Sequence, residues 1–265
     1  MTPLEDIELP EGDGETIHLN PAAQFQPRVL LPGDPARAMA IATAQLTQPR
    51  MFNHRRGLWG YSGETEDGVG FLVQATGMGG PSAAIVCEEL ADLGAEVFVR
   101  VGTCGAIDPN VKLGDLIVAR AAIGDDGTSQ ALGVGHGLGV GDGLGISGLI
   151  QADAELAGLL AQEAGASGHR FHDGAIGTVD LFYDPESGAR HLKLIERGAL
   201  AIEMEAAAVF AVGARREIPS ACLLAVTDEL WDQGERKRLT HDEIVELGET
   251  LGAVAVAAVS QFRPA

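Results

Sequence analysis

One stretch, residues 71–107 (FLVQATGMGGPSAAIVCEELADLGAEVFVRVGTCGAI), constrains the fold more than any other part of the chain. Two short apolar runs, residues 71–75 and 97–101, contain β-branched side chains and predict strands. Between them apolar residues recur at helical spacing, and Gly94 follows where a helix end favours a left-handed residue. A strand, a helix and a strand this close together predict a parallel pair with a right-handed crossover.

A glycine-rich loop is expected after each of these strands, at residues 77–80 (GMGG) and 102–105 (GTCG). Both loops would leave the same edge of the sheet, where open α/β sheets bind ligands. Arg100 lies within the second apolar run, and a buried guanidinium is costly unless it is paired. A structural ion pair would explain Arg100 equally well. The N–H groups and the hydroxyl of the following Gly-Thr-x-Gly turn can also hold an anion, so the combination predicts a phosphate pocket.

A second turn indicates the same chemistry. Residues 29–31 predict a strand, residues 32–35 (PGDP) a turn and residues 36–46 a helix. A helix N-terminus behind a glycine-containing turn favours an anion, and Arg37 would lie in the first helical turn. Such a turn is common by itself, so it indicates an anion site only in combination with Arg100.

Strand and helix patterns alternate along the 265 residues without a Pro/Ser-rich linker, so we expect one α/β domain. The net charge of −20, from 38 acidic and 18 basic residues, disfavours nucleic acid and anionic membranes as partners. No apolar run reaches transmembrane length, and the N-terminus has no signal-peptide pattern. Cys87, Cys104 and Cys222 lack metal-like spacing and favour reduced thiols in a cytoplasmic protein.

Two segments differ in composition from the rest. Residues 1–16 are expected to form a flexible acidic tail ahead of a domain at 17–265. Residues 124–148 contain ten glycines in 25 positions and are expected to form a mobile loop. A lid over a site is one role open to such a loop.

Four motifs together resemble the nucleoside phosphorylase-I family, which includes hexameric purine nucleoside phosphorylases and uridine phosphorylases. They are PGDPARA, TGMGGPS, VRVGTCGAI and EMEAAA, in this order and spacing, and the resemblance spans about residues 18–262. It implies a single-domain α/β/α sandwich with a mixed, partly barrel-like central sheet. It also implies a homo-oligomer built from dimers with shared sites, which would be a hexamer (a trimer of dimers). Phosphate would be the co-substrate, and neither a metal nor an organic cofactor is expected.

The same resemblance implies the site residues. The phosphate ligands would be Gly33, Arg37, Arg100 and Thr103, with Arg56 from the neighbouring subunit. The ribose contacts would be Met78, Met204 and Glu205, with His18 from the neighbouring subunit. The base contacts would be Cys104, Gly105, Phe182, Glu203 and Asp228, and the catalytic residues Arg100 and Asp228.

Several of these residues have plainer explanations. Arg55 adjoins Arg56 and is an alternative to it, and without the resemblance His18 and Arg56 would be solvated loop residues. A carboxylate accepts two hydroxyls of a diol, but Glu203 or Glu205 could also stabilise a helix start.

Base preference depends on a few positions. Asp228 could cap the next helix, but by resemblance it would stand beside purine N7, where uridine phosphorylases lack an acid. The Gln that reads uracil is missing and Arg190 is displaced, whereas TGMGGPS is closer to uridine-type members. We expect a purine nucleoside phosphorylase, with a uridine phosphorylase as the alternative.

Two other classes are less favoured. The retained phosphate ligands disfavour a nucleoside hydrolase, and the acid at position 228 disfavours a non-catalytic nucleoside-binding protein. One of Arg236, Lys237 and Arg238 would match a family arginine that assists the acid, unless all three are a solvated charge run. Further on, Thr240 and Glu243 predict a capping box for the last helix.

Overall fold

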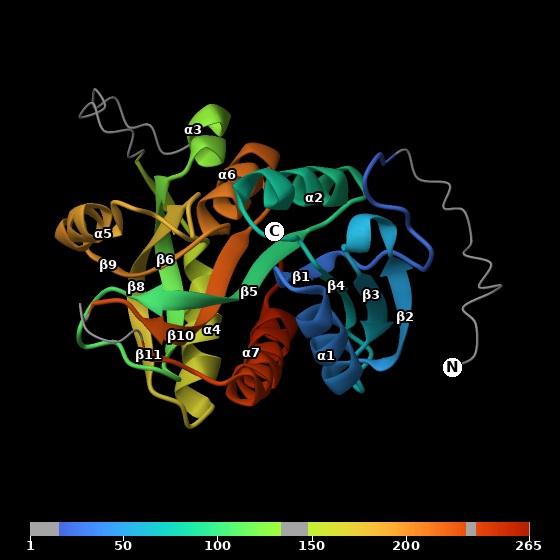
Figure 1. The fold of residues 1–265 in the computed structure, drawn as a ribbon. Helices are drawn as coiled ribbons and strands as arrows, with labels where there is room; N and C mark the ends of the chain where they lie inside the picture. Colours follow the sequence, from blue (N-terminus) through green and yellow to red (C-terminus); the bar gives the residue numbers. More distant parts are fainter. Residues whose placement is uncertain (1–15, 134–147, 232–236, 265) are drawn as a thin grey trace, which may run out of the picture.

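The computed structural model describes residues 16–133, 148–231 and 237–264 (Figure 1). Within these ranges the strands form one 11-stranded sheet in the order β11-β10-β6-β8-β9-β5-β1-β4-β3-β2, with β7 paired to β6. The strands are β1 (Arg28–Leu31), β2 (Thr47–Asn53), β3 (Gly60–Glu64), β4 (Gly70–Gln74), β5 (Val97–Ala106), β6 (Leu116–Asp125), β7 (Leu149–Gln151), β8 (Phe171–Val179), β9 (Ala199–Glu203), β10 (Ser220–Glu229) and β11 (Lys237–Arg238).

Part of this sheet closes on itself. Strand β10 pairs with β6 on one side and with β5 on the other, so β5, β10, β6, β8 and β9 form a five-stranded ring. Strands β1, β4, β3 and β2 extend from β5 as an open sheet. Because parallel and antiparallel pairs both occur, the prediction of a mixed, partly barrel-like sheet is confirmed.

Helices cover both faces of the sheet (Figure 1). They are α1 (Pro35–Gln45), α2 (Gly80–Asp92), α3 (Gly127–Leu132), α4 (Ala154–Ala166), α5 (Ser187–Glu196), α6 (Ala206–Arg216) and α7 (His241–Gln261), with a 3-10 turn, η1 (Arg55–Gly57). Leu90 of α2 and Phe210 of α6 lie in one buried core, and Ile41 of α1, Leu160 of α4 and Leu251 of α7 lie in the other. The architecture is therefore the expected α/β/α sandwich.

Strand β5 differs from its prediction. It continues through residues 102–105, which were expected to form a loop, because β10 pairs with it along almost its whole length. The glycines there serve close packing. A Cβ on Gly102 would lie 2.8 Å from Nη2 of Arg100, and one on Gly105 would overlap Cδ1 of Leu230. In addition, β1 lies between β4 and β5, so these two strands are parallel but not adjacent.

The glycine-rich segment also begins later than expected. Residues up to Asp125 complete β6, and α3 follows with Asp126 as its N-cap, accepting a hydrogen bond from the N–H of Ser129 at 2.7 Å. The prediction of a loop from residue 124 is therefore wrong for this part, because capping and strand pairing order it. Residues 134–147 and most of the predicted acidic tail, residues 1–15, lie outside the described residues.

The end of the chain follows its prediction. Thr240 and Glu243 form the capping box of α7, with the N–H of Thr240 donating to Glu243 at 2.7 Å. Across the ranges given above, no helix combines the length and the apolar character needed to cross a bilayer.

Candidate active site

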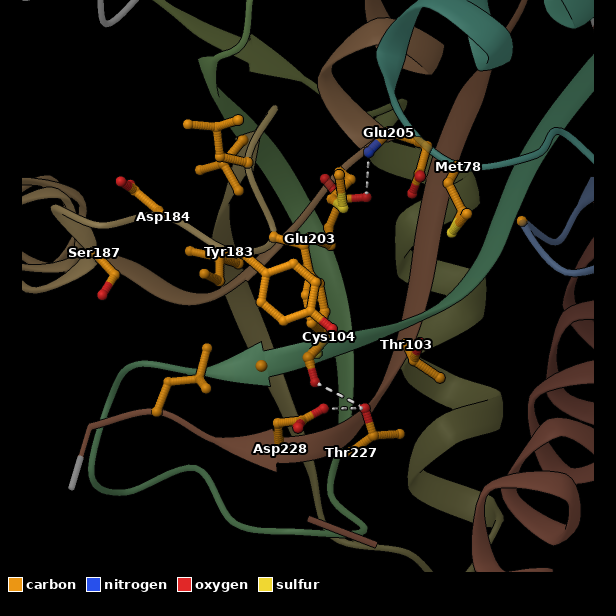
Figure 2. A pocket seen from close by; sticks show the side chains of 18 of the residues that line it. Met78, Thr103, Cys104, Tyr183, Asp184, Ser187, Glu203, Glu205, Thr227 and Asp228 are labelled. Carbon is orange, nitrogen blue, oxygen red and sulfur yellow. Dashed lines mark hydrogen bonds between the residues drawn. The ribbon is translucent and has the colours of Figure 1, made fainter. Parts of the chain in front are cut away.

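A cavity of about 910 Å³ brings together residues from Gly33 to Arg238 at the mouth of the five-stranded ring. Figure 2 shows side chains from several elements around this space, among them Thr103, Tyr183, Glu205 and Asp228. The predicted site residues that line it are Gly33, Arg37, Met78, Arg100, Thr103, Cys104, Gly105, Phe182, Glu203, Met204, Glu205 and Asp228. The motifs therefore meet in one pocket, as the sequence suggested.

Arg100 is the buried cation of the pocket. Its Nε donates to Oε2 of Glu203 at 2.6 Å, and its Nη2 lies 2.5 Å from Oε2 of Glu205. Nη1 is buried and has no hydrogen-bond partner within the described residues. A Cβ on Gly33 would lie 4.0 Å from Nη1, so this donor faces the Pro-Gly-Asp-Pro turn. An anion held at that turn would satisfy it.

Arg37 supplies a second cation at this end of the pocket. Its side chain runs along Gly248 of α7, where a Cβ would lie 3.5 Å from Cγ of Arg37. Burial lowers the pKa of the Arg37 guanidinium, Asp34 opposes that change, and the charge of Arg100 lowers it further. Two guanidinium groups that repel each other favour an anion between them. Thr103 adds a hydroxyl to the lining of the pocket.

Glu203, predicted as a base contact, lines the cavity and is also held by several hydrogen-bond donors. Its carboxylate is fully buried and accepts hydrogen bonds on both oxygens. The donors are Arg100 Nε, Thr178 Oγ1 at 2.5 Å, the N–H of Glu205 at 2.8 Å and the N–H of Ala206 at 2.9 Å. Glu203 therefore orients Arg100 and anchors the start of α6, although it borders the cavity.

Glu205 lies closer to the open space of the pocket. One oxygen accepts the N–H of Gly79 at 2.5 Å, and the other pairs with Arg100. Burial raises the pKa of the Glu205 carboxyl, and Arg100 opposes this effect. Met78 lies beside Glu205 in Figure 2, and Met204 also lines the cavity. A carboxylate with lone pairs toward the cavity and apolar neighbours can bind the hydroxyls and the carbon face of a sugar.

Asp228 lines the same pocket as Arg37 and Arg100. It is buried at the end of β10, and Oγ1 of Thr227 donates to its Oδ2 at 3.0 Å. Arg238 of β11 pairs with it in register, and Nε of Arg238 lies 3.7 Å from Oδ1 of Asp228. Of the three basic residues considered from the sequence, the structure thus places Arg238 beside the acid. Lys237 approaches Glu229 instead, and Arg236 lies outside the described residues.

The loop between β8 and α5 also lines the pocket. Phe182 is half-exposed and contacts Tyr183 edge-on, with ring centroids 5.0 Å apart. Asp184, Ser187 and His191 also line the cavity, and sequence reasoning assigned them no role. The position of all three within ten residues of Phe182 is the one signal that could have suggested them.

His18 and Arg56 do not line the cavity of their own chain. Nδ1 of His18 lies 2.6 Å from Oε1 of Glu89 on α2, and the N–H of Leu19 donates to the same carboxylate at 2.7 Å. Arg56 is exposed in η1 with a φ of 57°. Their contribution to a neighbouring subunit, like the choice between Arg55 and Arg56, stays a prediction.

The sequence profile of the Phosphorylase superfamily matches residues 27–262. The chain therefore belongs to this family, and the resemblance drawn from the four motifs is confirmed. The chain is 34% identical over 246 residues to the "purine nucleoside phosphorylase DeoD-type" of Streptococcus uberis, covering 89% of this chain and 98% of that protein. A protein of the same description from Hahella chejuensis is 35% identical over 237 residues, covering 87% of this chain and 94% of that protein.

A solved structure shares the fold. The uridine phosphorylase of Vibrio fischeri ES114 superposes with a TM-score of 0.73 at 24% identity, covering 89% of this chain and 91% of that chain. This likeness confirms the architecture of the sheet and its helices.

Proposed function

We propose that the protein is a nucleoside phosphorylase that acts on purine nucleosides, converting them reversibly to free base and ribose 1-phosphate. The observation that carries the proposal is the bonding pattern of the Arg100 guanidinium. Two of its nitrogens are held by buried carboxylates, and the third faces the glycine turn beside Arg37. This arrangement suits a phosphate ion.

The geometry supports a mechanism in three parts. Phosphate bound by Arg37, Arg100 and Thr103 lies near the sugar, stabilises an oxocarbenium-like transition state and attacks C1′. Glu205 accepts the ribose hydroxyls. Asp228 donates a proton to N7 as the purine leaves, assisted by the cation of Arg238. Phe182 packs against the base.

The purine is favoured over uracil for two reasons. The two relatives described above are named purine nucleoside phosphorylases. Asp228 also provides an acid at the base end, whereas two nitrogens of Arg190 are engaged by Asp125 and Asp184. Uridine remains the alternative substrate because the Vibrio fischeri structure of the same fold is a uridine phosphorylase.

The proposal includes a shared site. His18 and Arg56 would complete the pocket of a neighbouring subunit in a homo-oligomer, as a hexamer built of three dimers. Phosphate is the co-substrate, and no metal or organic cofactor takes part in this scheme. A cytoplasmic location is proposed on the basis of three buried free cysteines.

An assay of inosine, adenosine and uridine, with and without phosphate, tests the function. We expect turnover that depends on phosphate and yields ribose 1-phosphate, fastest with a purine nucleoside. Equal rates without phosphate and free ribose as product would exclude a phosphorylase. Sedimentation tests the assembly, because a fully active monomer at assay concentration would refute a shared site.

A further inference from the structure

The base end of the pocket depends on one short segment. Residues 181–191, which run from the end of β8 into the first turns of α5, supply eight of the residues that line the cavity. Phe182 is half-exposed and Tyr183 is largely exposed, so core packing alone constrains this segment weakly. Polar contacts therefore help to fix the position of the segment.

Arg190 makes the central contact. Its Nε lies 2.5 Å from Oδ2 of Asp184, in the loop ahead of α5, and its Nη1 pairs with Oδ2 of Asp125, at the end of β6. Both carboxylates are almost fully covered, with 6% and 5% of their side chains exposed. One guanidinium thus joins the loop, the helix and the sheet, and two-sided charge-assisted pairing gives it a defined geometry.

The electrostatics agree with this role. The hydrogen bond from Arg190 lowers the pKa of the Asp184 carboxyl, and the bonds to Asp184 and Asp125 raise the pKa of Arg190. Two more carboxylates lie close by. Burial raises the pKa of Asp126, with Asp180 adding to the effect, and Asp180 accepts the N–H of Gly127 at 2.9 Å. Without the cation of Arg190, these like charges would repel one another at the base of the loop.

We propose that Arg190 is a positioning residue for nucleoside binding, which fixes the wall that carries Phe182 by joining Asp184 to Asp125. This proposal rests on the proposed function. Arg190 acts through the loop and leaves the phosphate end, built on Arg37 and Arg100, unchanged. Its removal therefore weakens binding of the base and spares binding of phosphate.

The test compares Arg190→Met and Arg190→Lys with wild type, using inosine and phosphate as varied substrates. Arg190→Met is expected to raise the KM for inosine by about 10- to 100-fold, the equivalent of one charge-assisted hydrogen bond. The KM for phosphate is expected to stay within about twofold, and Arg190→Lys to recover part of the loss because it keeps the charge. An unchanged KM for inosine, or equal rises for both substrates, would overturn the proposal.

A matched control separates this role from general loss of an ion pair. Arg120 on β6 pairs with Asp173 on β8 at 2.5 Å, outside the cavity, so Arg120→Met should change neither KM. If Arg190→Met does not fold, Asp125→Asn removes one of the two anchors and should raise the KM for inosine alone, by a smaller factor. A rise in the KM for inosine of the same size in Arg120→Met would refute the positioning role of Arg190.

A binding measurement keeps the two proposals apart. Calorimetric titration of hypoxanthine, the free base, needs no turnover and is expected to show weaker binding to Arg190→Met than to wild type. If wild type proves independent of phosphate, the proposed function fails, yet this titration still decides the role of Arg190. Equal affinities of the two proteins for hypoxanthine would overturn it.

Discussion

Glu203→Gln tests whether the buried carboxylate orients Arg100 or contacts the base. Gln has the same shape but one oxygen, so it cannot accept from Arg100, Thr178 and the N–H groups of Glu205 and Ala206 together. Breaking a buried ion pair costs about 3–5 kcal/mol. Because Glu205 still pairs with Arg100, we take the lower end, about 3 kcal/mol. A loss of that size lowers the Tm by roughly 10 °C in a domain of this length.

Binding of phosphate should suffer as well. Arg100 is oriented less firmly when its charged Nε acceptor becomes a neutral amide, and one charge-assisted hydrogen bond corresponds to about 10- to 100-fold in affinity. Thermal unfolding and the KM for phosphate measure the two effects. Glu88→Gln is the matched control, because Glu88 pairs with Arg216 at 2.7 Å on the surface, where such pairs contribute little. An unchanged Tm and an unchanged KM for phosphate, with a change only in the accepted base, would favour the prediction that Glu203 contacts the base.

Three further outcomes are expected. Asp228→Asn should lower kcat for inosine by about 10²- to 10⁴-fold, and less for 7-methylguanosine, whose base already carries a positive charge; equal losses on both would contradict proton donation. Thr240→Ala should cost about 1 kcal/mol in thermal unfolding, because Glu243 loses its capping partner, and an unchanged Tm would contradict this. Asp115→Asn tests acid stability. Burial alone would raise the pKa of Asp115, but hydrogen bonds from Arg170 and other donors lower it below its unfolded value. The Asp115 carboxylate therefore stabilises the folded state above the unfolded pKa of about 3.9, and this stabilisation is lost as pH falls through the lower folded pKa. The difference in unfolding free energy between wild type and Asp115→Asn should therefore decrease below about pH 4. An increase there would contradict the expected direction of the pH dependence.

The parts of the site that could be predicted lie within single short segments. PGDPARA places Gly33 in a turn and Arg37 in the first turn of the following helix, and VRVGT places Arg100 and Thr103 on one strand, so spacing alone brings each pair together. The capping box at Thr240 is local in the same way.

The parts that could not be predicted depend on pairing between distant segments. Glu203 lies 103 positions from Arg100, and no periodicity in the sequence could show that its carboxylate accepts a hydrogen bond from that arginine. Arg190 lies 65 positions from Asp125, so the sequence likewise provided no indication of the pairing between them. The extension of β5 through Gly102 and Gly105 needed β10 as a partner, and glycine composition alone suggested a loop.

Closure of the ring by β10 has a consequence for the order in which the chain can fold. Strand β10 begins at Ser220, more than a hundred residues after β5 ends at Ala106. During synthesis Arg100 and its strand emerge first, and the edge of β5 that β10 later covers stays open to other partners. Non-local pairing of this kind is slow. A nascent chain that ends before Ser220 should therefore depend on chaperones to stay unaggregated, although its PGDPARA and VRVGT segments are already complete.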